Sequence, residues 1–461
     1  MQRGPLISRL LWWGKPPDSG CGGGGSSVGV GMSPSSRPTK LPALTGLRFL
    51  AALCVVVSHS IHAMTTAGNP LWSMYLGTLS AFGMALFFVL SGFVIHFNYS
   101  EQIREHRWRG TLNFFIARFA RLYPLYIVSV VLVLYQQGIL LSAWEGDVAA
   151  GGTLKFALPF YLSMTQTWIY AANGDFSLIY QFPSLQVMQV SWSISTEWFF
   201  YIIYPVVCIF LTRLRGTRLI WASSAIAAAT LVVMAAAFGA IGAIDRFAGD
   251  HFGPVATLAH GVQDSFYRWL VYFSPYAQVP EFLLGSMIAA SYRALQQRPS
   301  MREWSAGRCL PYLGLIIALG FHLVMFSPSH PLPFLTFLHM NFGFAVPIAL
   351  LLFGLVRYQT ALSRALSCGW MVACGDASYS IYLLHLLIIP NAGLDVFPIG
   401  QSSALTSIVL VRMIVAIAVV IGFSLLVYQV VEIPARRFLR RVLSIRMKQP
   451  GTELAPTLAA G

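Results

Sequence analysis

The first apolar segment of the chain carries two ionisable side chains, Arg48 and His59, at a helical spacing. Their separation of 11 residues is three turns plus about 20°, so in a helix both lie on one face, about 16 Å apart along the axis. A guanidinium at a membrane edge can hold a phosphate, and a buried imidazole can take a proton from a hydroxyl near neutral pH. The plainer interpretation, an arginine reaching the interface and a histidine packed in the core, stays open at this point.

Two further stripes of polar side chains occur in apolar segments. Ser193, Glu197 and Tyr201 recur every fourth residue and therefore share one helix face. A carboxylate at membrane depth needs a partner, and at a similar depth His59 is the one we expect Glu197 to orient. Ser378, Tyr382 and His385 form the second stripe, which fits polar packing between helices as well as it fits catalysis.

The composition indicates which elements must position these residues. Of 461 residues, 56% are hydrophobic and only 10% are charged, and the mean hydropathy is +0.67. A soluble domain is about 25% charged, so a soluble enzyme, a disordered chain and a fibrous protein are excluded. We predict an all-α polytopic membrane protein, in which each span takes about 20 apolar residues. About ten segments qualify: 43–64, 76–97, 113–137, 190–211, 219–241, 268–292, 310–327, 334–356, 372–394 and 404–432.

The positions of the charges set the expected orientation. Thirty Lys and Arg against 16 Asp and Glu give a net charge of +14, which would suit either nucleic-acid binding or basic cytoplasmic loops. When the predicted spans alternate from a cytoplasmic N-terminus, nearly all the basic residues fall on the inner side. This pattern argues against nucleic acid and predicts that both termini are cytoplasmic. If 154–170 also crossed, the basic loop 213–218 would lie outside, so we expect 154–170 to be a re-entrant or surface segment.

The remaining segments predict simple domain boundaries. Residues 1–40 are rich in Gly, Ser and Pro and read as a flexible tail, and Met32 is an alternative start to Met1. The membrane domain is expected at 41–441 and a cytoplasmic tail at 442–461. The six cysteines form no CxxC pair or Cys/His cluster, so neither a metal site nor a permanently bound cofactor is expected.

With these motifs in place, the sequence resembles the acyltransferase-3 family of integral membrane O-acyltransferases, which includes bacterial O-antigen and exopolysaccharide acetylases. The matching motifs occur in the family's order between residues 42 and 440. They are Arg48-x10-His59, Phe87-Phe88-Val-Leu-Ser91-Gly92-Phe93, Arg118-x-x-Arg121-Leu-Tyr123-Pro124, Trp192-Ser193-x-x-x-Glu197, Glu281-Phe282-Leu-Leu-Gly285, Ser378-Tyr379-x-x-Tyr382-Leu-Leu-His385 and Glu432-x-Pro434-Ala-Arg436-Arg437. One departure is Ile433, where the family pattern leads us to expect a polar residue.

The resemblance implies an activity and roles for these residues. Such enzymes move an acyl group, usually acetyl, from cytoplasmic acyl-CoA as co-substrate to a hydroxyl of a glycan or a small lipid-soluble acceptor. The catalytic residues carried over are His59 as general base, Arg48 and Glu197. The expected acyl-CoA-binding residues are the arginines of the cytoplasmic edge, namely Arg48, Arg118, Arg121, Arg436 and Arg437. Supporting roles are expected for Ser91, Trp192, Ser193, Ser378, Tyr382 and His385.

Several alternatives remain open from the sequence. The expected acceptor is a surface glycan or its lipid-linked precursor at a bacterial inner membrane, and the alternative acceptor is a macrolide-like small molecule. Transfer can be direct or can pass through an acyl-enzyme on Ser91, Ser193 or His59. A transporter is the alternative of another class, because intramembrane charges also suit it, although no half-to-half repeat is present.

Overall fold

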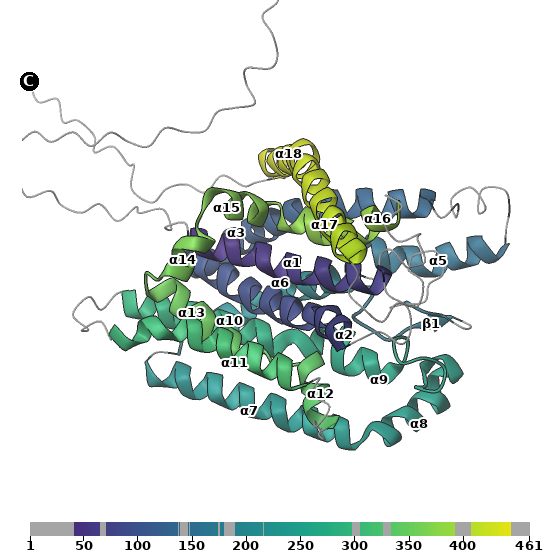
Figure 1. The fold of residues 1–461 in the computed structure, drawn as a ribbon, viewed down its shortest axis with the longest axis horizontal. Helices are drawn as coiled ribbons and strands as arrows, with labels where there is room; N and C mark the ends of the chain where they lie inside the picture. The colour runs from purple at the N-terminus through teal and green to yellow at the C-terminus, as the bar shows by residue number, and fades with distance from the viewer. Residues whose placement is uncertain are drawn as a thin grey trace, which may run out of the picture. The chain divides into compact units, whose positions relative to one another are not determined.

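A computed structural model describes most of the membrane domain (Figure 1). The described residues are 41–64, 71–136, 138, 146, 148–173, 176–178, 190–214, 216–296, 305–325, 333–391 and 407–443. The predicted flexible tail 1–40, and residues 444–461 of the predicted C-terminal tail, lie outside them. Within them the chain is almost entirely helical, and the two strands, β1 (Ala172–Asn173) and β2 (Phe176–Ser177), form a two-residue antiparallel pair.

The described residues form the following helices, in chain order. The first half contains α1 (Pro42–Met64), α2 (Leu71–Gly77), α3 (Leu79–Gln136), α5 (Val148–Leu162), α6 (Trp192–Leu211), α7 (Thr217–Gly239), α8 (Ile241–Phe252) and α9 (Phe266–Arg268). The second half contains α10 (Pro275–Gln296), α11 (Leu310–Val324), α12 (Pro333–Met340), α13 (Ala345–Arg357), α14 (Ala361–Leu366), α15 (Gly369–Asp376), α16 (Ser378–Asn391), α17 (Ser407–Val427) and α18 (Ile433–Leu443). The described residues include two π-helical turns, at Trp269–Phe273 before α10 and at Tyr428–Glu432 between α17 and α18.

The length and composition of these helices confirm an all-α polytopic membrane protein. Six helical stretches are long and apolar enough to cross a bilayer, or up to eight if each of two bent pairs counts as one span, among the residues the structure describes. The number of ten spans and the cytoplasmic location of both termini stay predictions.

The longest stretch contains α3, which is a helical hairpin. A straight helix of its 58 residues would be about 87 Å long, far more than the ~30 Å hydrocarbon core. Its backbone leaves the helical conformation at Arg107, where φ is 37°. The two arms on either side of this turn pack against each other: the ring centres of Tyr99 on the first arm and Phe114 on the second lie 5.2 Å apart. The arms therefore correspond to the predicted spans 76–97 and 113–137.

Two segments expected to be single spans are broken instead. The predicted span 334–356 is the pair α12 and α13, bent by 45°, and 372–394 is the pair α15 and α16, bent by 67°. The second break lies where α15 crosses α1, since Gly375 approaches the backbone of Thr45 so closely that no Cβ would fit. This close crossing lets α16 turn and run along α1, which it contacts.

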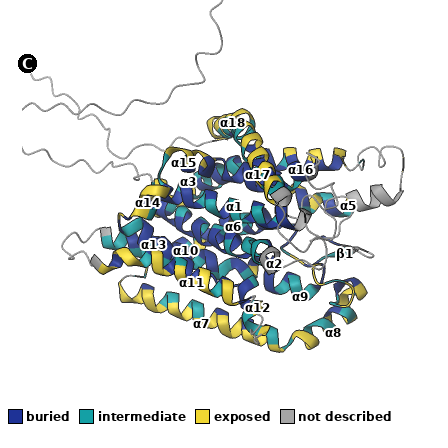
Figure 2. Ribbon diagram, in the orientation of Figure 1, coloured by how far each residue is buried: buried dark blue, intermediate teal, exposed yellow. Residues whose placement is uncertain are grey.

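Burial separates central from peripheral helices. Figure 2 shows α1, α3 and α6 mostly buried, whereas α7 and α17 carry wide exposed faces. Those faces are apolar, with Trp221 and Val232 on α7 and Phe423 on α17 among the exposed side chains, as expected for surfaces that contact lipid.

The segment 154–170 packs against the central helices. Its helix, α5, has 15 residues and is not among the described helices that are long enough to span, and the re-entrant or surface location of this segment stays a prediction. After α5 the chain turns back, and Gln166 donates hydrogen bonds to Ser191 while Thr167 donates one to Ser195 over 2.9 Å. These contacts fix the N-terminal end of α6, which carries Glu197.

A glycine contact sets how closely α3 and α10 can approach. A Cβ on Gly285 would overlap the carbonyl oxygen of Val89, so the two backbones meet directly there. We expect Gly285→Leu to force these helices apart and to lower the free energy of unfolding by at least about 3 kcal/mol. The measurement is the apparent Tm of the purified protein in detergent, followed by size-exclusion chromatography after heating.

Gly320→Leu on α11 is the matched control. No atom lies within 4 Å of the position its Cβ would take, and the residue is exposed. The same substitution there should leave the apparent Tm nearly unchanged. An equal loss of Tm in both variants would contradict the proposed close crossing at Gly285.

Candidate active site

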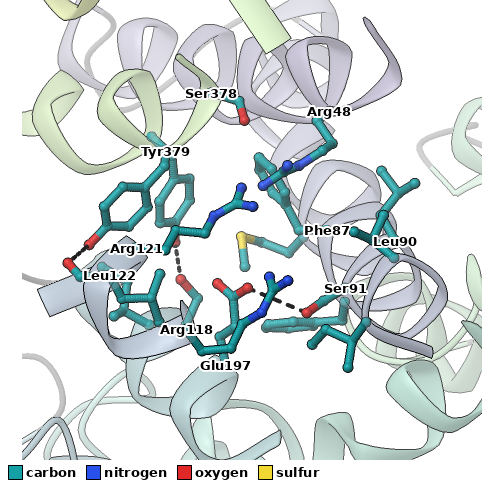
Figure 3. Close-up of a pocket in the computed structure, with 17 residues that line it drawn as sticks. Arg48, Phe87, Leu90, Ser91, Arg118, Arg121, Leu122, Glu197, Ser378 and Tyr379 are labelled. Atoms are coloured by element: carbon teal, nitrogen blue, oxygen red, sulfur yellow. Dashed lines mark hydrogen bonds between the residues drawn. The ribbon is translucent and has the colours of Figure 1, made fainter. Parts of the chain in front are cut away.

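A pocket lies between α1, α3, α6 and α16 (Figure 3). It brings together eight of the residues that the sequence singled out. They are Arg48, Ser91, Arg118, Arg121, Ser193, Glu197, Ser378 and Tyr382. Because these residues come from four helices distributed over most of the chain, the pocket is a product of the tertiary structure.

Three arginines give the pocket its charge. Figure 3 shows the guanidinium groups of Arg48, Arg118 and Arg121 directed toward the space in front of the Glu197 carboxylate. With one carboxylate against three guanidinium groups, these four residues carry a formal charge of +2. Such a cluster suits an anion with several oxygens, since arginine pairs with phosphate through two parallel hydrogen bonds.

Arg118 is held rigidly by aromatic rings. Its side chain is only 6% exposed, and its guanidinium carbon lies 4.5 Å from the ring centre of Tyr99 and 5.6 Å from that of Tyr201. The Nε atom of Arg118 is buried without a hydrogen-bond partner. Leaving such a donor unpaired is costly, so this atom points to a ligand that completes the site.

Glu197 belongs to this arginine pocket. Its Oε1 accepts hydrogen bonds from Tyr201 at 2.5 Å and from Ser91 at 3.4 Å. Ser193, Glu197 and Tyr201 therefore share one helix face as expected. Tyr201 bonds to Glu197, whereas Ser193 donates a hydrogen bond to the hydroxyl of Tyr382 at 2.7 Å. Glu197 was expected to orient His59, but it is hydrogen-bonded to Ser91 and Tyr201, and the ring of His59 has another partner.

That partner is His385. The Nδ1 atom of His59 lies 2.7 Å from Nε2 of His385, and the two rings are nearly parallel, with centres 5.0 Å apart. Nδ1 of His385 lies 2.6 Å from the carbonyl oxygen of Tyr382, and because a carbonyl only accepts, this nitrogen carries the hydrogen. In neutral rings, His385 then accepts at Nε2, His59 donates from Nδ1, and the lone pair of His59 is on Nε2.

Tyr382 connects the histidine pair to the pocket. Its side chain lines the pocket, and its own carbonyl fixes His385. Its hydroxyl donates to the carbonyl of Val190 at 2.9 Å while accepting from Ser193. The hydroxyl and the carbonyl of Tyr382 are both hydrogen-bonded, so the tyrosine is held in place where the pocket and the histidine pair meet.

The other predicted residues lie outside the pocket. Trp192 packs against Phe88 and Tyr272, with ring centres 5.7 and 4.9 Å apart. Arg436 is 4.0 Å from Glu432, and Arg437 is exposed, so neither joins the three pocket arginines. Among the described residues no group of three or more His, Cys, Asp or Glu could hold a metal ion.

No role was assigned from the sequence to Tyr99 or to the motif residue Tyr379. The ring of Tyr99, on one arm of the α3 hairpin, packs against the guanidinium group of Arg118 on the other arm. Tyr379 lines the pocket, and its hydroxyl donates a hydrogen bond to the carbonyl of Leu122 at 2.7 Å. Tyr379 adjoins Ser378 in a quoted motif, which was a usable signal. Nothing in the spacing of Tyr99 and Arg118 indicated their contact, because it depends on the reversal at Arg107.

Comparison with known proteins assigns the family. An acyltransferase domain model, acyltransferase-3, matches residues 41–428, so the chain belongs to this family of acyltransferases. It is similar to the acyltransferase MdmB of Streptomyces mycarofaciens, at 26% identity over 92% of this chain and 98% of that protein. It is also similar to the peptidoglycan O-acetyltransferase OatA of Listeria monocytogenes, at 28% identity over 39% of this chain and 26% of that protein. No solved structure matches significantly.

The family, the apolar helices and these relatives together define an integral membrane enzyme that transfers acyl groups other than aminoacyl groups.

Proposed function

We propose that this enzyme transfers an acetyl group from acetyl-CoA to a hydroxyl of a surface glycan or its lipid-linked precursor, at the bacterial inner membrane. The observation that carries the donor assignment is the pocket of three arginines with a buried, unpartnered Nε on Arg118. Coenzyme A offers several phosphate oxygens to such a pocket. The similarity to a peptidoglycan O-acetyltransferase supports a glycan acceptor and an acetyl donor.

In the proposed reaction, His59 is the general base. Its Nε2 takes the proton of the acceptor hydroxyl as the hydroxyl oxygen attacks the thioester carbonyl carbon. The tetrahedral intermediate collapses, the carbon–sulfur bond breaks, and the imidazolium of His59 returns the proton to the coenzyme A sulfur. His385 accepts the hydrogen on Nδ1 of His59 and so keeps Nε2 basic, the role that a carboxylate fills in a serine hydrolase.

The arginines are placed to bind the donor rather than to react. Arg48 lies on the same helix as His59, about 16 Å away along the axis, so a donor held at Arg48 can extend its thioester arm along α1 toward His59. The Glu197 carboxylate lowers the net positive charge of the pocket. Its hydrogen bonds with Ser91 and Tyr201 hold these side chains in place.

Replacing Arg48 tests the donor site. We expect Arg48→Gln to raise the Kd for acetyl-CoA about tenfold or more, because one hydrogen-bonded charge pair to phosphate is lost. The Kd of the unmodified protein should rise with KCl concentration, and the Kd of the variant should rise less steeply. Calorimetric titration of the protein in nanodiscs provides both numbers.

Arg213→Gln, in the connection after α6 and outside the pocket, is the control and should leave the Kd unchanged. Loss of affinity with an unaltered salt dependence would contradict phosphate contact at Arg48. Transfer of labelled acetyl to isolated glycans tests the acceptor. Label found in a small macrolide-like product and absent from glycans would overturn that assignment.

A further inference from the structure

The last described helix, α18, has two chemically opposite faces. Its four arginines, 436, 437, 440 and 441, fall within about 140° of the helix circumference. Phe438, Leu439 and Val442 fall on the opposite side, within about 100°. Two of these apolar side chains are largely exposed, Phe438 by 65% and Val442 by 61%. An exposed apolar face opposite a basic one is typical of a helix that lies in a membrane surface.

The position of α18 in the chain supports this interpretation. It follows α17, a long apolar helix with exposed faces, and the π-helical turn at Tyr428–Glu432 and Pro434 separate the two. Figure 2 shows α18 exposed at the end of α17. The helix α18 therefore continues directly from an apolar helix that is long enough to span a bilayer.

The helix α18 packs against α3. At the start of α18, Arg436 lies beside Glu432. Arg436 is partly buried there, whereas Arg437, Arg441, Phe438 and Val442 are exposed.

Coenzyme A does not explain this surface as well as lipid does. Neither Arg437 nor Arg441 lines the arginine pocket, and phosphates bound by the arginines would leave Phe438 and Val442 in water. A phospholipid layer satisfies both faces at once: acyl chains cover the apolar side chains, and headgroup phosphates pair with guanidinium groups. α18 contains no acidic residue, so its charge is complementary to anionic headgroups.

We propose that α18 is a binding surface for anionic phospholipid, with Phe438 and Val442 in the acyl–headgroup boundary and Arg437 and Arg441 on the phosphates. This proposal is independent of the acyl donor and acceptor. It assigns the predicted donor residue Arg437 to lipid.

Hydrogen–deuterium exchange of the full chain in nanodiscs tests the proposal. The backbone amides of α18 should exchange more slowly in discs of phosphatidylcholine with 30% phosphatidylglycerol than in phosphatidylcholine alone. In the double variant Arg437→Gln/Arg441→Gln, the protection factor of these amides in the anionic discs should fall about 30-fold, the equivalent of about 1 kcal/mol for each arginine. Phe438→Ser should also reduce the protection.

The control Arg213→Gln/Arg218→Gln removes two arginines elsewhere and should leave the protection of α18 unchanged. Equal exchange of α18 in both lipids would overturn the proposal. So would protection that appears in pure phosphatidylcholine when coenzyme A is added, since α18 would then belong to the donor site. Exchange is measured without turnover, so failure of the proposed transferase reaction would not affect this result.

Discussion

His59→Ala is expected to lower kcat for acetyl transfer by about 10³-fold, because the group that removes the acceptor proton is lost. Its Nδ1 is already committed to His385, so in the neutral pair the basic lone pair is on Nε2. The Kd for acetyl-CoA should change little, since His59 does not line the arginine pocket. Single-turnover transfer and calorimetric binding measure the two quantities separately.

A buried histidine can also matter only for packing, and His96→Ala controls for this. His96 is buried on α3 and lies 3.4 Å from the hydroxyl of Tyr204, outside the pocket. Its replacement should cost far less activity at equal yield of folded protein. Comparable losses in both variants, or transfer retained in His59→Ala, would remove His59 from the reaction.

His385→Leu should lower kcat by about 10²-fold while the KM for acetyl-CoA stays nearly constant. Without the ring of His385, the hydrogen on Nδ1 of His59 has lost its acceptor, and the tautomer with Nε2 basic is no longer favoured. His385→Gln supplies an amide oxygen that can accept the same hydrogen and should restore part of kcat. The pH profile of kcat should shift in His385→Leu and return toward that of the unmodified enzyme in His385→Gln.

The chain contains a matched control for this pair. His322 and His339 are also buried, with Nδ1 of His322 2.9 Å from Nε2 of His339, and neither lines the pocket. His322→Leu should leave kcat and its pH profile unchanged. If His385→Leu and His385→Gln behaved alike, with no shift in the pH profile, His385 would be a packing residue.

The period of the α-helix and the length of a membrane span were enough to predict several features of this protein from its sequence. Arg48 and His59 lie on one helix, and the 3.6-residue period relates them whatever the rest of the chain does. Composition likewise predicted a polytopic helical membrane protein, because the requirement for about 20 apolar residues per span acts on each segment by itself. These inferences needed no knowledge of which helices are neighbours.

Helix breaks were not predictable in the same way. The bend of 67° between α15 and α16 follows no proline, and it arises where Gly375 meets the backbone of Thr45. A glycine in an apolar segment is compatible with a straight span too, so the sequence did not distinguish the two outcomes.

Side-chain partners were decided only by the tertiary structure. The sequence indicated that Glu197 and His59 are polar groups within apolar segments that need partners, since ionisable side chains at membrane depth are costly. It did not determine the pairing: Glu197 is held by Ser91 and Tyr201 beside the arginines, and His59 is paired with His385, 326 residues away. A hydrogen bond requires an approach of about 3 Å. Helical period places a side chain on a face, but only the packing of α16 against α1 brings two faces that close.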